Sequence, residues 1–320
     1  MNRDFPLAYA CINKDNQVRK KSSSGGIFYL LAKYVFMHDG IICAARYDLD
    51  WNVVHSICES LDDIESFMGS KYVQSRLGEI YKTIRELLKT GTLIMFVGTP
   101  CQVAGLKSFL RKEYSTLILV DLVCHGVPSP VIWKKYLEEQ AQGKHIEKIS
   151  FRSKRDGWLK FSPKISYSDG STFQEVQCRD PFLHGFMQNL YLRPSCFECS
   201  FKGLERESDL TLGDFWGIQK LDLNMFDDKG TSLVLIQSKK GLTIWNEISH
   251  QLKTKEFDTE EAVKENSAIF MSVKPHKNRD KFFKEYRYKG IIRAEHTCTK
   301  VSLQLKVMCK IRKLFKKAID

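Results

Sequence analysis

The sequence predicts an α/β fold, with a parallel or mixed sheet flanked by helices and a smaller α+β part toward the C-terminus. Two continuous apolar runs, 93–97 and 117–120, have the composition of strands that are buried on both faces of a parallel sheet. Each run is followed by a helical pattern, over 101–110 and 130–142. Strand and helix in alternation are typical of parallel α/β units.

The other elements follow from hydrophobic periodicity, taken in chain order. The first half contains strand patterns over 5–13, 40–47 and 53–58, and helical patterns over 26–37 and 76–88. The second half contains strand patterns over 146–152, 160–167, 172–176 and 232–237, and a helical pattern over 242–252. Asp169-Gly170 marks a turn between two of these strands.

The stretch 193–217 has a different amino-acid composition. It is dense in Cys, Gly, Arg and aromatic residues and has little periodicity, which predicts a site-bearing loop. We expect three parts in the chain: an α/β half over 1–143, an α+β half over 144–290, and a basic amphipathic helix over 291–320.

Composition and charge narrow the class of protein. The chain has 320 residues, 43% of them hydrophobic and 28% charged, which is typical of a soluble globular protein. It has no apolar run of membrane-spanning length and no signal peptide, so we expect a cytoplasmic protein. The formal net charge of +12 favours anionic partners. Part of it lies in the C-terminal helix, which is either a solvated helix or one that contacts an anionic membrane surface.

Ten cysteines are many for a protein of a reducing compartment, where clustered cysteines more often serve metal or redox chemistry than disulfides. Cys196 and Cys199 form a Cys-x-x-Cys pair, which supplies two of the four ligands of a zinc site or an iron–sulfur cluster. Cys101 and Cys124 each follow one of the two buried strands. If those strands are neighbours, both thiols lie at the carboxyl edge of the sheet, where α/β proteins bind ligands. Otherwise the two are ordinary buried cysteines.

Two further motifs precede helices. Ser23, Ser24, Gly25 and Gly26 can present backbone amides and hydroxyls to an anion, or can simply cap the helix. The segment 69–75, Gly-Ser-Lys-Tyr-Val-Gln-Ser, combines a cation, an aromatic ring and amide donors.

Read in order, the motifs resemble the coenzyme F420 hydrogenase/dehydrogenase beta-subunit family. They are Ser-Ser-Ser-Gly-Gly-Ile, Gly-Ser-Lys-Tyr-Val-Gln-Ser, Val-Gly-Thr-Pro-Cys-Gln, Cys-His-Gly-Val-Pro-Ser, Arg-Pro-Ser-Cys-x-x-Cys and Ser-Asp-x-Thr-x-Gly-Asp-Phe-Trp-Gly. The resemblance implies an oxidoreductase that holds FAD and a 4Fe-4S cluster and passes electrons between the cluster and a hydride-exchanging substrate.

The resemblance also implies the residues that hold each cofactor. It implies that the cluster ligands are Cys101, Cys124, Cys196 and Cys199. It implies that the flavin contacts are Ser23, Ser24, Gly25, Gly26, Lys71, Tyr72, Thr99, Gln102 and Lys229.

The chain departs from many bacterial members at its N-terminus. Those members begin with a ferredoxin-like module, whereas the first 40 residues here contain one cysteine, Cys11. The resemblance therefore implies a separate ferredoxin or ferredoxin-like electron donor. It further implies a small-molecule substrate and no nucleic acid, and it associates bacterial relatives with polysaccharide modification.

Two other functions remain open at this stage. The same four cysteines could hold zinc in a binding protein without redox activity. Cys124 and His125 could form a nucleophile and its base, although adjacent residues at the end of a strand point apart.

Overall fold

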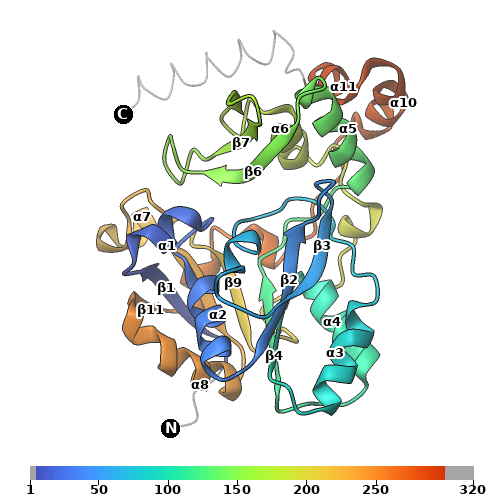
Figure 1. Cartoon of the computed structure of the whole chain (residues 1–320). Coiled ribbons are helices and arrows are strands. Elements are labelled where there is room, and N and C mark those ends of the chain that lie inside the picture. The colour runs from blue at the N-terminus through green and yellow to red at the C-terminus, as the bar shows by residue number, and fades with distance from the viewer. Residues whose placement is uncertain (1–4, 300–320) are drawn as a thin grey trace, which may run out of the picture.

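The computed structural model describes residues 5–299. Eight strands form one mixed sheet in the order β11-β1-β10-β9-β5-β4-β2-β3 (Figure 1). They are β1 (Leu7–Asn13), β2 (Ile41–Tyr47), β3 (Val53–Cys58), β4 (Ile94–Gly98), β5 (Leu117–Leu122), β9 (Leu210–Asp214), β10 (Ser232–Ile236) and β11 (Leu252–Phe257). The four central strands, β9, β5, β4 and β2, are parallel, and the outer pairs are antiparallel. The predicted fold class is thus confirmed, with β4 and β5 as parallel neighbours.

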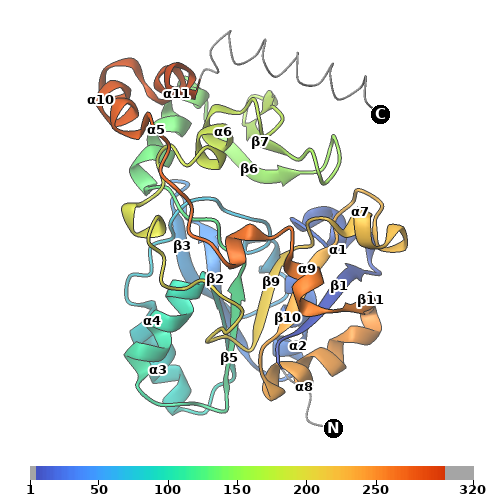
Figure 2. The same ribbon diagram turned by 180° about the vertical axis from the view of Figure 1, so that it is seen from behind.

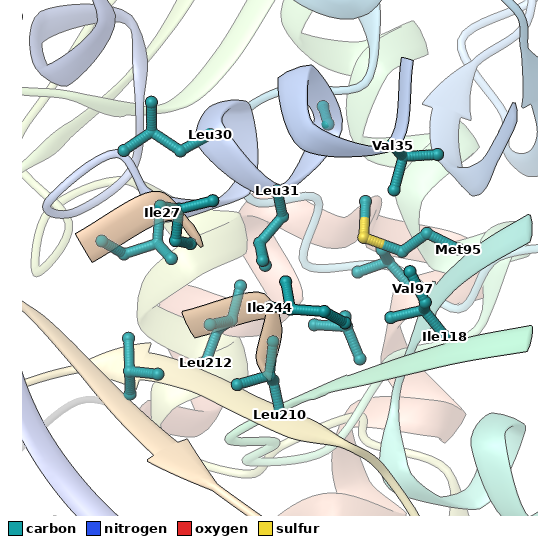
Figure 3. Close-up of a cluster of buried hydrophobic side chains, with 14 of the residues drawn as sticks. Ile27, Leu30, Leu31, Val35, Met95, Val97, Ile118, Leu210, Leu212 and Ile244 are labelled. Atoms are coloured by element: carbon teal, nitrogen blue, oxygen red, sulfur yellow. The ribbon is translucent and has the colours of Figure 1, made fainter. Parts of the chain in front are cut away.

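Helices cover both faces of this sheet, which is why β4 and β5 read as continuous apolar runs. On one face, α2 (Ile27–Met37) and α8 (Lys239–Ile248) pack against Met95 and Val97 (Figure 3). On the other face, α3 (Ile80–Lys89) and α4 (Pro100–Leu110) pack against Ile94 and Phe96. Successive residues of one strand therefore enter two different cores. Short helices α7 (Ile218–Leu221) and α9 (Thr259–Val263) cover the part of the sheet around β1 and β10.

A smaller lobe lies above the sheet in Figures 1 and 2. Its three-stranded sheet consists of β6 (Ile146–Ser153), β7 (Ser162–Tyr167) and β8 (Thr172–Gln174). Its helices are α5 (Pro130–Ala141), α6 (Pro181–Met187), α10 (Arg279–Lys289) and α11 (Ile291–Thr299). The large side chains of Trp133, Phe182 and Phe282 are buried in its core.

The small lobe covers the edge of the sheet at which the parallel strands end. Tyr47, the last residue of β2, stacks on Trp133 of α5 with ring centroids 6.4 Å apart. Asp214, the last residue of β9, forms an ion pair with Arg152 of β6. The carboxyl edge of the sheet, where ligands bind in α/β folds, thus lies between the two lobes.

Several elements differ from the sequence prediction. The prediction of a loop throughout 193–217 is wrong, because β9 lies within this stretch and pairs with β5 and β10 in the middle of the sheet. Unpredicted helices and strands are α1 (Asn16–Lys21), α6, α7, α9, α10 and the edge strand β11. The division into 1–143 and 144–290 stays a prediction; β9, β10 and β11 belong to the same sheet as β1–β5.

The predicted C-terminal helix over 291–320 begins with α11, and its basic part from 300 onward lies outside the described residues. Within residues 5–299, no helix is both long enough and apolar enough to cross a membrane.

Candidate functional site

Four cysteines from three separate segments line one pocket of about 270 Å³. Cys101 lies in the first turn of α4, directly after β4, and Cys124 follows β5. Cys196 and Cys199 come from the loop between α6 and β9. The structure therefore brings together all four cysteines that the resemblance implied as ligands, at the carboxyl edge of two neighbouring parallel strands.

Backbone contacts hold the Cys-x-x-Cys loop against the end of β5. Pro128 and Leu192 form an isolated antiparallel bridge, and the Arg193 N–H donates to the Val127 carbonyl at 2.9 Å. Gly126 has a φ of 149°, and a Cβ added there would lie 3.3 Å from the Cβ of Cys196. A glycine is thus what allows the strand end and the loop to approach so closely.

The pocket disfavours bare thiolates. Burial, followed by the charge of Cys101, raises the pKa of Cys124 to about 12. Burial also raises the pKa of Cys196. Burial and the neighbouring sulfurs thus disfavour the thiolate forms of Cys124 and Cys196, and a bound cationic centre would favour them. The four cysteines share this pocket, yet within residues 5–299 no group of three or more His, Cys, Asp or Glu side chains is arranged to hold a metal ion.

The neighbouring histidine is directed elsewhere. The Nε2 atom of His125 lies 2.7 Å from Asn189 Oδ1, and its ring packs 5.1 Å from the ring of Phe186. The His125 ring is held by Asn189, and the pKa of the Cys124 thiol is raised. Cys124 and His125 therefore do not form an activated nucleophile and its base.

The residues implied as flavin contacts form a second polar cluster beside the pocket. Ser23 Oγ accepts hydrogen bonds from the backbone N–H and the hydroxyl of Ser70, at 2.6 and 2.8 Å. Thr99 caps α4 and lines the four-cysteine pocket, with its hydroxyl 3.1 Å from Cys101 Sγ. The Gln102 amide nitrogen donates to Ser75 Oγ at 2.8 Å, which ties α4 to the segment 69–75.

Arg152 of β6 joins these motifs across the two lobes. Its two Nη atoms each lie 3.0 Å from an Asp214 oxygen, and they also donate to Tyr72 Oη and the Ser23 carbonyl. Its side chain is 3% exposed, and its guanidinium lies 3.9 Å from the centre of the Phe161 ring. This bidentate ion pair is the main polar link between the small lobe and the sheet.

Lys154, the residue directly after β6, completes the network. Its Nζ donates to the carbonyls of Arg19, Ser24 and Lys229 at 2.7–2.8 Å. Burial, and then the charges of Arg152 and Arg19, lower the pKa of Lys154 to about 7. The sequence analysis missed both Arg152 and Lys154; two cations two residues apart, one at the end of the strand predicted over 146–152 and one just beyond it, were the signal that could have found them.

Some implied flavin contacts have their polar groups engaged within the protein. Lys71 Nζ donates to the carbonyls of Phe67, Met68 and Gly69, and burial lowers its pKa to about 7. Gln102 Oε1 accepts from the Thr99 N–H in a capping box. The Lys229 N–H donates to Asp227 Oδ1 at 3.1 Å.

Gly25 and Gly26 shape the start of α2. Gly26 is its N-cap with a φ of 89°, as a glycine allows. Gly25 is wedged between two strands: a Cβ there would lie 2.2 Å from the Cys11 carbonyl oxygen and 2.8 Å from the Ser232 nitrogen.

We therefore expect Gly25→Ala to destabilise the fold itself, by about 3 kcal/mol, because backbone atoms on both strands would have to move. Ser24→Ala, which removes one hydroxyl bond to the Thr231 carbonyl, is expected to cost about 1 kcal/mol. Urea unfolding of the two variants measures both free energies. Equal costs would show that the strands yield and that Gly25 is not needed for packing.

Comparisons with known proteins agree with this architecture. Residues 8–82 match the family model for the N-terminal part of the coenzyme F420 hydrogenase/dehydrogenase beta subunit. Residues 91–261, more than half of the chain, match the model for the C terminus of the same beta subunit. The chain belongs to the coenzyme F420 hydrogenase/dehydrogenase beta-subunit family.

Hydrogenases and dehydrogenases are oxidoreductases, so the chain belongs to an oxidoreductase family. Among solved structures, it resembles a chain of the F420-reducing NiFe hydrogenase complex from Methanosarcina barkeri, with a TM-score of 0.56 and 18% sequence identity. The likeness covers 90% of this chain and 96% of that one, and it shows a shared fold. None of the curated proteins matches the sequence.

Proposed function

We propose that this member of the family is an iron–sulfur flavoprotein that transfers electrons between a 4Fe-4S cluster and a small-molecule substrate through FAD. One observation carries the proposal: four cysteines from three distant segments line a single pocket at the carboxyl edge of the sheet. Clustered cysteines that form no disulfide framework are typical of metal or redox sites.

The donor types fit an iron–sulfur cluster, whose four cysteines each bind a different iron and so need not surround a single metal ion. Four cysteine thiolates are the usual ligands of a 4Fe-4S centre, and such a centre stores and releases one electron at a time. Cys101, Cys124, Cys196 and Cys199 would hold it. The loop that carries the last two also presents Lys202, whose Nζ donates to the Cys124 carbonyl at 2.8 Å and so ties the loop to the strand end.

Unpartnered polar atoms between the lobes support a flavin site next to the pocket. Tyr47 Oη, His55 Nδ1 and Gln74 Oε1 are buried and have no hydrogen-bond partner among the described residues. Buried polar atoms are rarely left without a partner, and the polar edge of a bound ring would supply one. His55 and Gln74 contact the segments that lead to the pocket. His55 Nε2 lies 3.0 Å from the carbonyl of Val97, two residues before the pocket-lining Thr99, and the Gln74 N–H donates to the carbonyl of Pro128, which follows the pocket-lining Val127.

A bound flavin would supply both hydride transfer and single-electron transfer, which connects a substrate to a one-electron centre. The chain's own residues would bind and orient it. We assign the contacts to Ser23, Ser24, Gly26, Tyr72 and Thr99, with Gly25, Lys71, Gln102 and Lys229 shaping the segments that carry them. Arg152 would fix the small lobe over the site through Asp214.

The electron donor that we propose is a separate ferredoxin-like protein. The similar chain of known structure comes from a hydrogenase complex, which supports a partner protein for this chain as well. A cytoplasmic location, a link to polysaccharide modification and contact of the basic C-terminus with a membrane remain proposals.

The test is the metal and flavin content of the protein purified without oxygen. We expect a brown-yellow protein with about four iron atoms and one FAD per chain, whose visible absorbance is bleached by dithionite. A colourless protein with about one zinc would contradict the proposal and favour the non-redox alternative.

A further inference from the structure

Arg206 is a buried cation in the wall of the four-cysteine pocket, and neither the motifs nor the family resemblance singled it out. It lines the pocket together with the four cysteines, and its side chain is only 3% exposed. Its Nε donates to the Gly203 carbonyl at 2.9 Å and its Nη1 to the Phe201 carbonyl at 3.3 Å. Its Nη2 is buried and has no partner among the described residues.

The second cation of the pocket is used differently. Lys202 Nζ donates to two backbone carbonyls, those of Cys124 and Ala268, at 2.8 and 2.7 Å. The one acidic residue that lines the pocket, Glu198, is exposed to solvent, where its charge is screened. Arg206 is thus the pocket-lining cation with a buried donor nitrogen, Nη2, that has no partner at all among the described residues.

Asp121 holds Arg206 from the sheet side. Its carboxylate Oδ2 lies 3.7 Å from Arg206 Nη1, and its side chain is 1% exposed. Asp121 is in β5, three residues before Cys124, so the strand that supplies a cysteine also supplies the counter-ion. At this distance the pair has a loose geometry, and the guanidinium is not neutralised as it would be by a bidentate contact.

We propose that Arg206 sets the reduction potential of the centre held by the four cysteines, with Asp121 as its opposing counter-ion. The inference rests on the proposed function. One-electron reduction adds one negative charge to the pocket, and a buried guanidinium in its wall stabilises the reduced form more than the oxidised form. Asp121 opposes this effect, because its own charge acts with the reverse sign.

The experiment is a redox titration of the anaerobically purified full chain, followed by electron paramagnetic resonance of the reduced centre. Four proteins are compared with the wild type: Arg206→Gln, Arg206→Lys, Asp121→Asn and Lys107→Gln. Lys107 is the matched control, since it loses the same charge from a solvent-exposed pair with Glu207 outside the pocket lining. Iron per chain is measured for each variant.

We expect opposite shifts of the midpoint potential: more negative for Arg206→Gln and more positive for Asp121→Asn. Arg206→Lys, which keeps the charge, should lie close to the wild type, as should Lys107→Gln. If Arg206→Gln fails to retain iron, wild-type potential in Arg206→Lys together with the positive shift of Asp121→Asn would still support the inference.

Two results would overturn the inference. One is an unchanged potential in an iron-loaded Arg206→Gln protein. The other is a shift of Asp121→Asn in the same direction as Arg206→Gln, which would mark a merely structural role for both residues. A wild-type protein that contains no iron would instead refute the proposed function, before any variant is compared.

Discussion

Cys196→Ala is expected to lose the iron of the protein almost completely and to lose the fixed structure of the segment 193–208, which precedes β9. The loop between α6 and β9 has few apolar contacts of its own, so metal–thiolate bonds would supply much of its folding free energy. Iron content and amide hydrogen exchange of the segment 193–208 measure the two effects.

Cys178→Ala and Cys298→Ala are the controls for this experiment. Cys178 is exposed and Cys298 is buried in the small lobe, and neither lines the four-cysteine pocket. Both variants should keep wild-type iron. Retention of iron by Cys196→Ala, together with its loss in Cys178→Ala, would show that the ligands are assigned to the wrong cysteines.

Arg152→Met is expected to destabilise the protein by about 3 kcal/mol, because it leaves the largely buried Asp214 carboxylate without its cation. Asp214 would retain the hydrogen bond from Trp158 Nε1 at 2.7 Å, which does not offset a lost charge. The same variant should release FAD, since Arg152 also fixes Tyr72 and Ser23. Urea unfolding and bound-flavin absorbance are the measurements.

Arg155→Met is the matched control in the same segment. Arg155 pairs with Asp156 at the surface, and its loss should leave the free energy of unfolding unchanged within error. Adding Asp214→Asn to Arg152→Met should recover part of the lost stability, because no unpaired charge then remains. A cost for Arg152→Met no greater than that for Arg155→Met would exclude Arg152 as the link between the lobes.

The elements predicted well are those whose burial is visible along the chain. In β4, every residue is buried, so the strand appears as an uninterrupted apolar run that ends at a glycine. In β9, the buried residues Leu210–Leu212 are too few to form a recognisable apolar run, and acidic residues, Asp209 and Asp214, lie on either side of them. The sequence pattern therefore does not predict this strand. In β11, an edge strand of the sheet, half of the sequence Leu-Lys-Thr-Lys-Glu-Phe is charged, as edge strands often are.

The candidate site was predictable to the extent that its chemistry is local. Cys101 and Cys124 each follow a recognisable strand, and the pairing of those strands was enough to place them together. Arg152 and Arg206 could not be found in this way, because what makes each notable is burial beside a partner far along the chain. Arg152 meets Asp214 across 62 residues, and only the assembled tertiary structure brings the two together.

The position of β1 has a consequence for synthesis of the chain on the ribosome. β1 lies between β10 and β11, and Tyr9 of β1 donates to Glu256 of β11 across 247 residues of sequence. At about 5–20 residues per second, translation takes roughly 12–50 s to produce those partners. During that interval both edges of β1 lack the strands that finally cover them, which exposes the nascent chain to incorrect strand pairing.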